Sequence, residues 1–156
     1  MPADRVKVQF DLEPNDGHGY ETETLWAEAL GGARFRILNS PFFAFGISSE
    51  DVVKADPHGT QYRFQEVAYR GGHSTYRLFL QHNLTIHDDG FKQHWHGLAA
   101  QHCTFENAND SLVAVDVPPE ADVTEVYRLL ERGEADGIWA FEEVHYAGGR
   151  AGGRPG

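Results

Sequence analysis

Residues 70–77, with the sequence Arg-Gly-Gly-His-Ser-Thr-Tyr-Arg, lie at the centre of the chain and decide how its two halves connect. Two strand-like runs, Tyr62–Tyr69 and Ser74–Leu80, flank the glycine pair Gly71-Gly72. Because a glycine pair between two strand patterns is a turn signal, we expect one hairpin that both halves share. No linker intervenes, so we expect a single rigid unit rather than two mobile domains.

The residues before this segment show short strand patterns separated by turns. Val6–Asp11 alternates between apolar and polar side chains, as a half-buried strand does. Further strands are expected at 24–30 and 33–38, around Gly31-Gly32, and from Val52 to the turn at 56–59. This spacing is typical of a small barrel or a strongly curled sheet. The sequence therefore predicts a β-barrel-like half over residues 1–69.

The residues after the segment follow the order strand, helix, strand, strand, helix, strand. The helices are expected at 88–102 and from Asp122, which with Glu125 forms a capping-box-like start. The later strands are expected at 104–106, 112–117 and 138–144. This is the order of the split βαβ or ferredoxin-like arrangement, so the predicted fold class is α+β, with a ferredoxin-like half over residues 70–146. The Gly-rich tail 147–156 cannot bury enough surface to fold and is expected to be disordered.

The composition narrows the choice of partner and compartment. The formal charge is -11, with 24 acidic and 13 basic residues, which disfavours nucleic acid and anionic membranes because phosphate binding needs clustered Lys and Arg. A basic protein partner fits this charge, and so does plain solubility. The single cysteine, Cys103, excludes an intrachain disulfide, and no apolar run reaches the length of a membrane span. We expect a cytoplasmic protein.

The central segment also holds the candidate functional residues. On a strand that begins at Ser74, His73, Thr75 and Arg77 would share one face, while Tyr76 would pack under the helices. His73 could act as a general acid or base. Arg70 and Arg77 could hold a carboxylate or phosphate.

Two interpretations of these residues remain open. In the first, His73, Arg70 and Arg77 form a catalytic site, assisted by Ser74 or Tyr76. In the second, they form a polar patch in which the two arginines pair with the protein's own carboxylates, such as Glu142 or Glu143.

Other patterns are weaker. His94 and His96 lie two apart on a predicted helix and point nearly opposite ways, so no metal site is expected. The glycine pairs lack the pattern of a phosphate loop, and no cofactor is expected. Trp139 and Phe141 are expected to leave the helix-packed face of the last strand and to bury against the N-terminal half.

Several stretches resemble a known family. They are Leu25–Glu28, Pro41–Ala44, Gly46–Ser48, Gly72–Thr75 with Arg77, Leu112–Pro118, and Trp139 with Glu142-Glu143. Together they resemble a bacterial family catalogued as domain of unknown function 4265, over about Val6 to His145. The resemblance supports the architecture and implies no activity.

Two functions fit these observations. The first is a non-catalytic binding protein of the immunity or regulatory kind, with a basic protein as its partner. The small size, acidic charge, abundant aromatic residues and lack of a complete catalytic set favour it. The alternative is a small metal-independent enzyme (a hydrolase, a lyase, or a peptide or natural-product tailoring enzyme) that acts on an anionic small molecule through His73.

Overall fold

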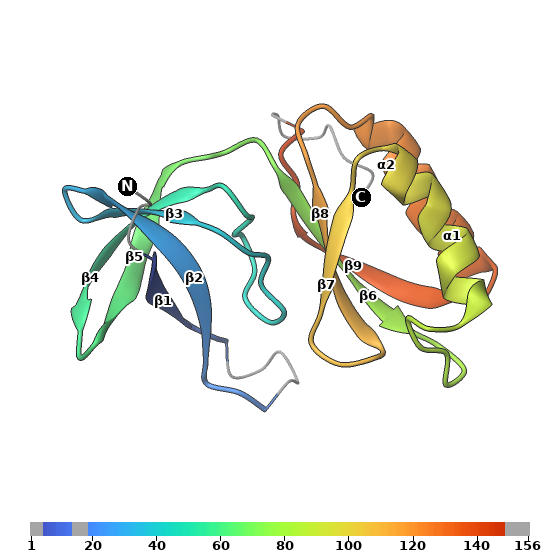
Figure 1. Cartoon of the computed structure of the whole chain (residues 1–156), viewed down its shortest axis with the longest axis horizontal. Coiled ribbons are helices and arrows are strands. Elements are labelled where there is room, and N and C mark those ends of the chain that lie inside the picture. Colours follow the sequence, from blue (N-terminus) through green and yellow to red (C-terminus); the bar gives the residue numbers. More distant parts are fainter. Residues whose placement is uncertain (1–4, 14–18, 149–156) are drawn as a thin grey trace. The chain divides into compact units, whose positions relative to one another are not determined.

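The computed structural model describes residues 5–13 and 19–148 and has a mixed α+β fold, as predicted. The chain divides into two compact units, Met1–His73 and Ser74–Gly156, so the division falls four residues later than the expected boundary after Tyr69. Most of the tail predicted at 147–156 lies outside the described residues. Figure 1 shows strands alone in the first unit and both helices in the second.

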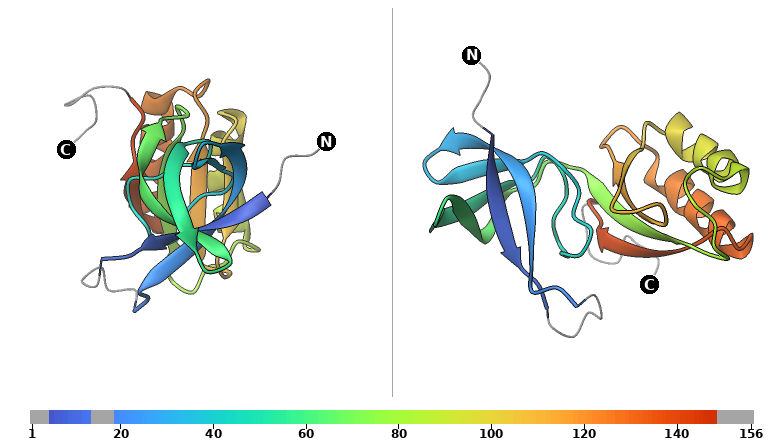
Figure 2. Two further views of the ribbon diagram at one scale, coloured as in Figure 1. Left: turned by 90° about the vertical axis from the view of Figure 1, so that its left-hand side faces the viewer. Right: turned by 60° about the horizontal axis from the view of Figure 1, so that its bottom comes forward.

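The first unit is a sheet of five strands that closes into a ring. Its strands are β1 (Arg5–Asp11), β2 (Thr22–Gly31), β3 (Arg34–Ile37), β4 (Val52–His58) and β5 (Gln61–Tyr69). Neighbours along the chain pair antiparallel, and β5 pairs parallel with β1 to close the ring (Figure 2). Alternate side chains of the strands, such as Val8, Phe10 and Val53, fill its interior. The expected hairpin around Gly31-Gly32 is confirmed, and both glycines have positive φ.

The second unit is an antiparallel sheet covered by two helices. Its elements are β6 (Ser74–Leu80), α1 (Asp89–Ala100), β7 (Thr104–Asn107), β8 (Leu112–Val117), α2 (Val123–Ala135) and β9 (Trp139–His145). The sheet order is β7-β8-β6-β9, with every neighbouring pair antiparallel. Both helices lie on the same face of this sheet (Figures 1 and 2). The predicted order of strands and helices is confirmed.

The second helix begins where the sequence predicts. The side chain of Asp122 accepts hydrogen bonds from the backbone N–H groups of Thr124 and Glu125 at 3.1 and 3.2 Å. These bonds satisfy two of the donors that every helix leaves open in its first turn. Val126 and Leu130 then turn toward the sheet and are fully buried there.

The predicted hairpin between Tyr62–Tyr69 and Ser74–Leu80 is wrong. Strand β5 pairs with β4 and β1, while β6 pairs with β8 and β9, so each strand has both of its edges occupied within its own unit. Gly71 has a different reason to be glycine. A Cβ there would lie 2.6 Å from the carbonyl carbon of Glu50, and nearer still to its oxygen. The glycine pair therefore lies in the connection between β5 and β6. There Gly71 allows the backbone to pass close to the backbone of Glu50.

The predicted placement of Trp139 and Phe141 is also wrong. Both pack beneath the helices rather than against the first unit. The indole Nε1 of Trp139 donates a hydrogen bond to the carbonyl of Leu130 at 2.9 Å, and the ring of Phe141 lies 5.5 Å from that of Tyr127. The alternation of β9 gives its polar face to Glu142, and this leaves the aromatic side chains to the core.

Candidate functional site

The N-terminal end of the central segment is held by a buried carboxylate. Asp51 is fully buried in the first unit, and its Oδ2 lies 2.9 Å from Nη1 of Arg70. The same nitrogen donates to the carbonyl of Gly46 at 2.7 Å. Asp51 also accepts from the backbone N–H groups of Ser48 at 3.0 Å and Gly71 at 2.9 Å. Arg70 is therefore engaged in fixing the chain around Gly71.

The C-terminal end of the segment places a second arginine against a second carboxylate. Arg77 lies opposite Glu142 in the β6–β9 ladder, and its Nε donates to Oε1 of Glu142 at 2.7 Å. The side chain of Arg77 is 2% exposed, while that of Glu142 is 39% exposed. The pairing of Arg77 with Glu142, one of the two interpretations of the segment, is confirmed.

The remaining predicted site residues lie in other environments. Tyr76 points under the helices as predicted, with its ring among Tyr127 and Phe141. Ser74 is 2% exposed, and its hydroxyl accepts a hydrogen bond from the backbone of Ala147 at 2.9 Å. His73 is half-buried and is the last residue of the first unit. The structure thus places Arg70 and His73 in one unit and the other three in the second, and their catalytic role stays a prediction.

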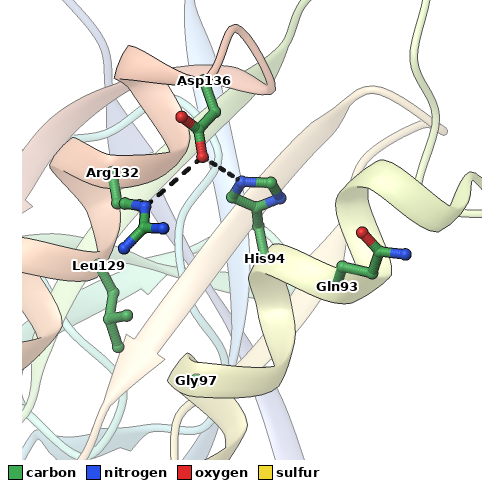
Figure 3. A pocket seen from close by; sticks show the side chains of 6 residues that line it. All are labelled: Gln93, His94, Gly97, Leu129, Arg132 and Asp136. Carbon is green, nitrogen blue, oxygen red and sulfur yellow. Dashed lines mark hydrogen bonds and ion pairs between the residues drawn. The ribbon is translucent and has the colours of Figure 1, made fainter.

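The structure shows a polar contact between α1 and the C-terminal end of α2 that the sequence did not reveal. His94 of α1 bonds through Nδ1 to the carbonyl of Gly90 and through Nε2 to Oδ2 of Asp136, each at 2.8 Å. Figure 3 shows the Asp136 carboxylate between the imidazole of His94 and the guanidinium of Arg132, whose Nε lies 3.7 Å away. Because both partners of the ring are acceptors, both bonds form together only when the imidazole carries two protons. All three side chains line a cavity between α1 and α2.

This contact predicts a loss of stability in acid. The hydrogen bond from His94 is the main cause that holds the pKa of Asp136 below its usual range. A carboxylate with a lowered folded pKa stabilises the fold above its unfolded pKa of about 3.9, and that contribution disappears as the pH falls through the folded pKa. In low salt, we expect Asp136→Asn to melt below wild type at about pH 6 and by a smaller margin at about pH 2.5, because the contribution of the carboxylate is lost as the pH falls toward and through its lowered folded pKa.

Circular dichroism melts at the two pH values check this expectation. Glu134→Gln on the same helix is the control, since it also removes an exposed acid and should melt alike with wild type at both pH values. An Asp136→Asn variant that melts with wild type at pH 6 would contradict the prediction.

The single cysteine and the side chains that can ligate metals are the other groups with possible reactivity. Burial, with a smaller effect from Asp116, raises the pKa of Cys103 to about 12, so at neutral pH it is a thiol and a poor nucleophile. Within residues 5–13 and 19–148, no three His, Cys, Asp or Glu side chains are grouped to hold a metal ion. In the same ranges, no helix combines the length and apolar character needed to cross a membrane.

Asp51 and Asp136 are bonding partners of Arg70 and His94 that the sequence did not reveal. Asp51 acts on Arg70 across 19 residues, and Asp136 acts on His94 across 42. Nothing in the residues next to either aspartate marks its partner.

Comparisons with known proteins agree with this fold. A family model described as "Domain of unknown function (DUF4265)" matches residues 23–141. Among solved structures, "Novel crystal structure of a hypothetical protein from Neisseria gonorrhoeae" superposes with a TM-score of 0.77 at 16% identity, over 93% of this chain and 97% of that chain. At this identity the likeness shows the fold alone. No curated protein matches the chain.

Proposed function

Since the chain belongs to the family described as "Domain of unknown function (DUF4265)", whose description names no activity, we propose its function from the site and the charge. The protein is a non-catalytic module that binds a basic protein, of the immunity or regulatory kind. The observation that carries this proposal is the engagement of both arginines of the central segment by carboxylates of their own units.

The engaged arginines argue against an anion clamp. A guanidinium that holds a substrate carboxylate or phosphate presents its N–H groups to the ligand in two parallel bonds. Here Arg77 is buried and its Nε donates a hydrogen bond to Glu142. The Nη1 of Arg70 donates to the carboxylate of Asp51 and to the carbonyl of Gly46. The enzyme alternative needs both groups for an anionic substrate, whereas a binding module needs neither.

The distribution of charge supports a basic partner. Residues 74–156 hold thirteen acidic and six basic side chains, whereas residues 1–73 hold eleven and seven. Of those six basic side chains, Arg77, Arg128 and Arg132 each lie against a carboxylate of the same unit. The second unit therefore carries a surplus of negative charge, which attracts and orients a basic protein before contact.

The proposal also includes the fold type of each unit and a cytoplasmic location for the protein. Five strands in a closed ring support a β-barrel-like first unit. The order β7-β8-β6-β9, with helices after β6 and β8, supports a ferredoxin-like second unit. Such a scaffold offers helix faces for recognition. A buried, unreactive single cysteine is compatible with the cytoplasm.

The association rate of the captured partner tests this function. We expect affinity capture to yield a basic protein whose on-rate falls about tenfold or more between about 20 and 200 mM salt. The variant Glu120→Lys/Glu134→Lys, both on exposed positions of the second unit, should slow association in low salt. The matched control Asp56→Lys/Glu66→Lys makes the same charge change on the first unit and should slow it less. A partner without basic character, or a salt-insensitive on-rate, would refute the proposal.

A further inference from the structure

A cavity of about 320 Å³ lies within the second unit, between one face of α2 and the end of β9. Three tyrosines line it: Tyr76 from β6, Tyr127 from α2, and Tyr146, which follows β9. Its volume is near the lower end of the roughly 300–1,000 Å³ typical of ligand pockets. It has room for about one long side chain.

The aromatic walls of the cavity are held in place by the core. Tyr76 is 2% exposed and lies at the base, with its ring centroid 6.4 Å from that of Tyr127. Phe141 packs edge-on against Tyr127 at 5.5 Å. The faces of aromatic rings are electronegative and attract cations. Two of the three lining rings, those of Tyr76 and Tyr127, are therefore packed against neighbouring aromatic side chains before any ligand binds.

The charged groups at the rim favour a cation as well. Arg128 lines the cavity, but its Nε and Nη2 bond to the two carboxylate oxygens of Glu125 at 2.8 and 2.5 Å. This pair neutralises the one lining cation, and the hydrogen bond from Arg128 lowers the pKa of Glu125. Glu131 lines the same cavity, is exposed, and has no hydrogen bond or ion pair among the described residues. Its carboxylate remains available to a ligand.

We propose that this cavity receives an arginine side chain from the protein partner. The inference rests on the proposed function and names the contact that such a partner makes. The apolar stem of the arginine packs on Val123 and the tyrosine rings, its guanidinium stacks on a ring face, and its N–H groups bond to Glu131. Arginine suits this pocket better than lysine because its planar group stacks on aromatic faces and is less strongly hydrated. The acid surplus of residues 74–156, thirteen acidic against six basic side chains, complements a basic partner.

Peptide titration tests the chemistry of the pocket. The ligand is Gly-Arg-Gly blocked at both ends, compared with the same peptide carrying lysine or citrulline, a neutral analogue with the shape of arginine. We expect the arginine peptide to shift the amide resonances of residues 123–131, the lysine peptide to bind about fivefold more weakly, and citrulline to show no saturation. Equal binding by citrulline overturns the inference, and equal binding by lysine overturns the assignment to arginine.

Variants of one helix test the location. Glu131→Gln should weaken the arginine peptide about fivefold, while Glu134→Gln, which removes the same charge from α2 outside the cavity and affects only the long-range attraction, should weaken it by less than about twofold. Tyr127→Leu should weaken it to a similar degree, with folding checked by the same spectra. Equal effects of the two glutamate variants would reveal attraction by the overall charge and overturn the pocket.

The two proposals fail in different ways. If the captured partner associates in a salt-dependent manner and Glu131→Gln does not alter its affinity, the pocket is overturned and the binding function stands. If the arginine peptide binds the pocket but the captured partner is not basic, the proposed function is overturned together with the partner named here.

Discussion

Asp51→Ala is expected to lower the free energy of unfolding of the first unit by about 3–5 kcal/mol. The carboxylate is fully buried and accepts hydrogen bonds from two backbone N–H groups and from Arg70. Its removal leaves the buried N–H group of Ser48 unsatisfied, at about 1–3 kcal/mol, and also removes the bonds that the carboxylate accepts from Gly71 and Arg70. Since domains are stable by only about 5–15 kcal/mol, this loss would unfold much of the population under mild denaturation.

Urea unfolding followed through the amide resonances of each unit measures this loss separately for the two units. Asp56→Ala is the matched control: it makes the same change on the neighbouring strand β4, where the side chain is exposed. Its effect should stay within about 0.5 kcal/mol. An Asp51→Ala variant as stable as the control would show that these three bonds do not stabilise the fold.

Gly133→Ala is expected to lower the free energy of unfolding of the second unit by about 2–4 kcal/mol. A Cβ at this position would lie 2.6 Å from Nε1 of Trp139 and closer still to two carbons of its ring. The indole is 1% exposed and is fixed by its hydrogen bond to Leu130, so moving it costs packing and that bond. The better helix propensity of alanine, about 1 kcal/mol, offsets only part of this cost.

Gly97→Ala provides the matched comparison in the facing helix. Its Cβ would meet only the end of the Leu129 side chain, at 3.0 and 3.1 Å, and a leucine can change rotamer. We expect a stability within about 1 kcal/mol of wild type, because helix propensity and mild crowding oppose each other. Chemical denaturation monitored by tryptophan fluorescence compares the two variants, and equal losses would contradict the role given to Trp139.

The sequence predicted local structure well because periodicity acts between neighbours. Alternation along Val6–Asp11 and helical spacing near Phe91 report which side chains share a face, and these patterns need no knowledge of the partner. The cap at Asp122 and the positive-φ turn at Gly31-Gly32 are decided within four residues. For the same reason the alternation of β6 correctly turned Tyr76 toward the helices and away from the face of Arg77.

The candidate site was predicted less well, since its interactions span long distances in the chain. One of the two open interpretations paired the arginines with carboxylates such as Glu142 or Glu143, and Arg77 does bond to Glu142, 65 residues away. Nothing in the sequence indicated that the side chain of Arg77 would be buried. The partners of Arg70 and His94 were missed, and so was the contribution of Tyr127 and Tyr146 to a cavity with Tyr76. In each case the sequence shows the type of side chain at a position. Which other side chain it contacts depends on how elements distant in the chain pack together.

The sequence alone determined the α+β class, the places of most strands and helices, and the acidic character of this protein. Each of these depends on local periodicity or on composition. Tertiary structure decided which strands pair across the central glycines. Strands β5 and β6 are adjacent in sequence, but their edges are taken by β1, β4, β8 and β9, and strand pairing depends on which edges remain open when the sheets assemble. As a result of this strand pairing, the boundary between the two units falls after His73. Arg70 therefore pairs with Asp51 in the first unit, and Arg77 pairs with Glu142 in the second.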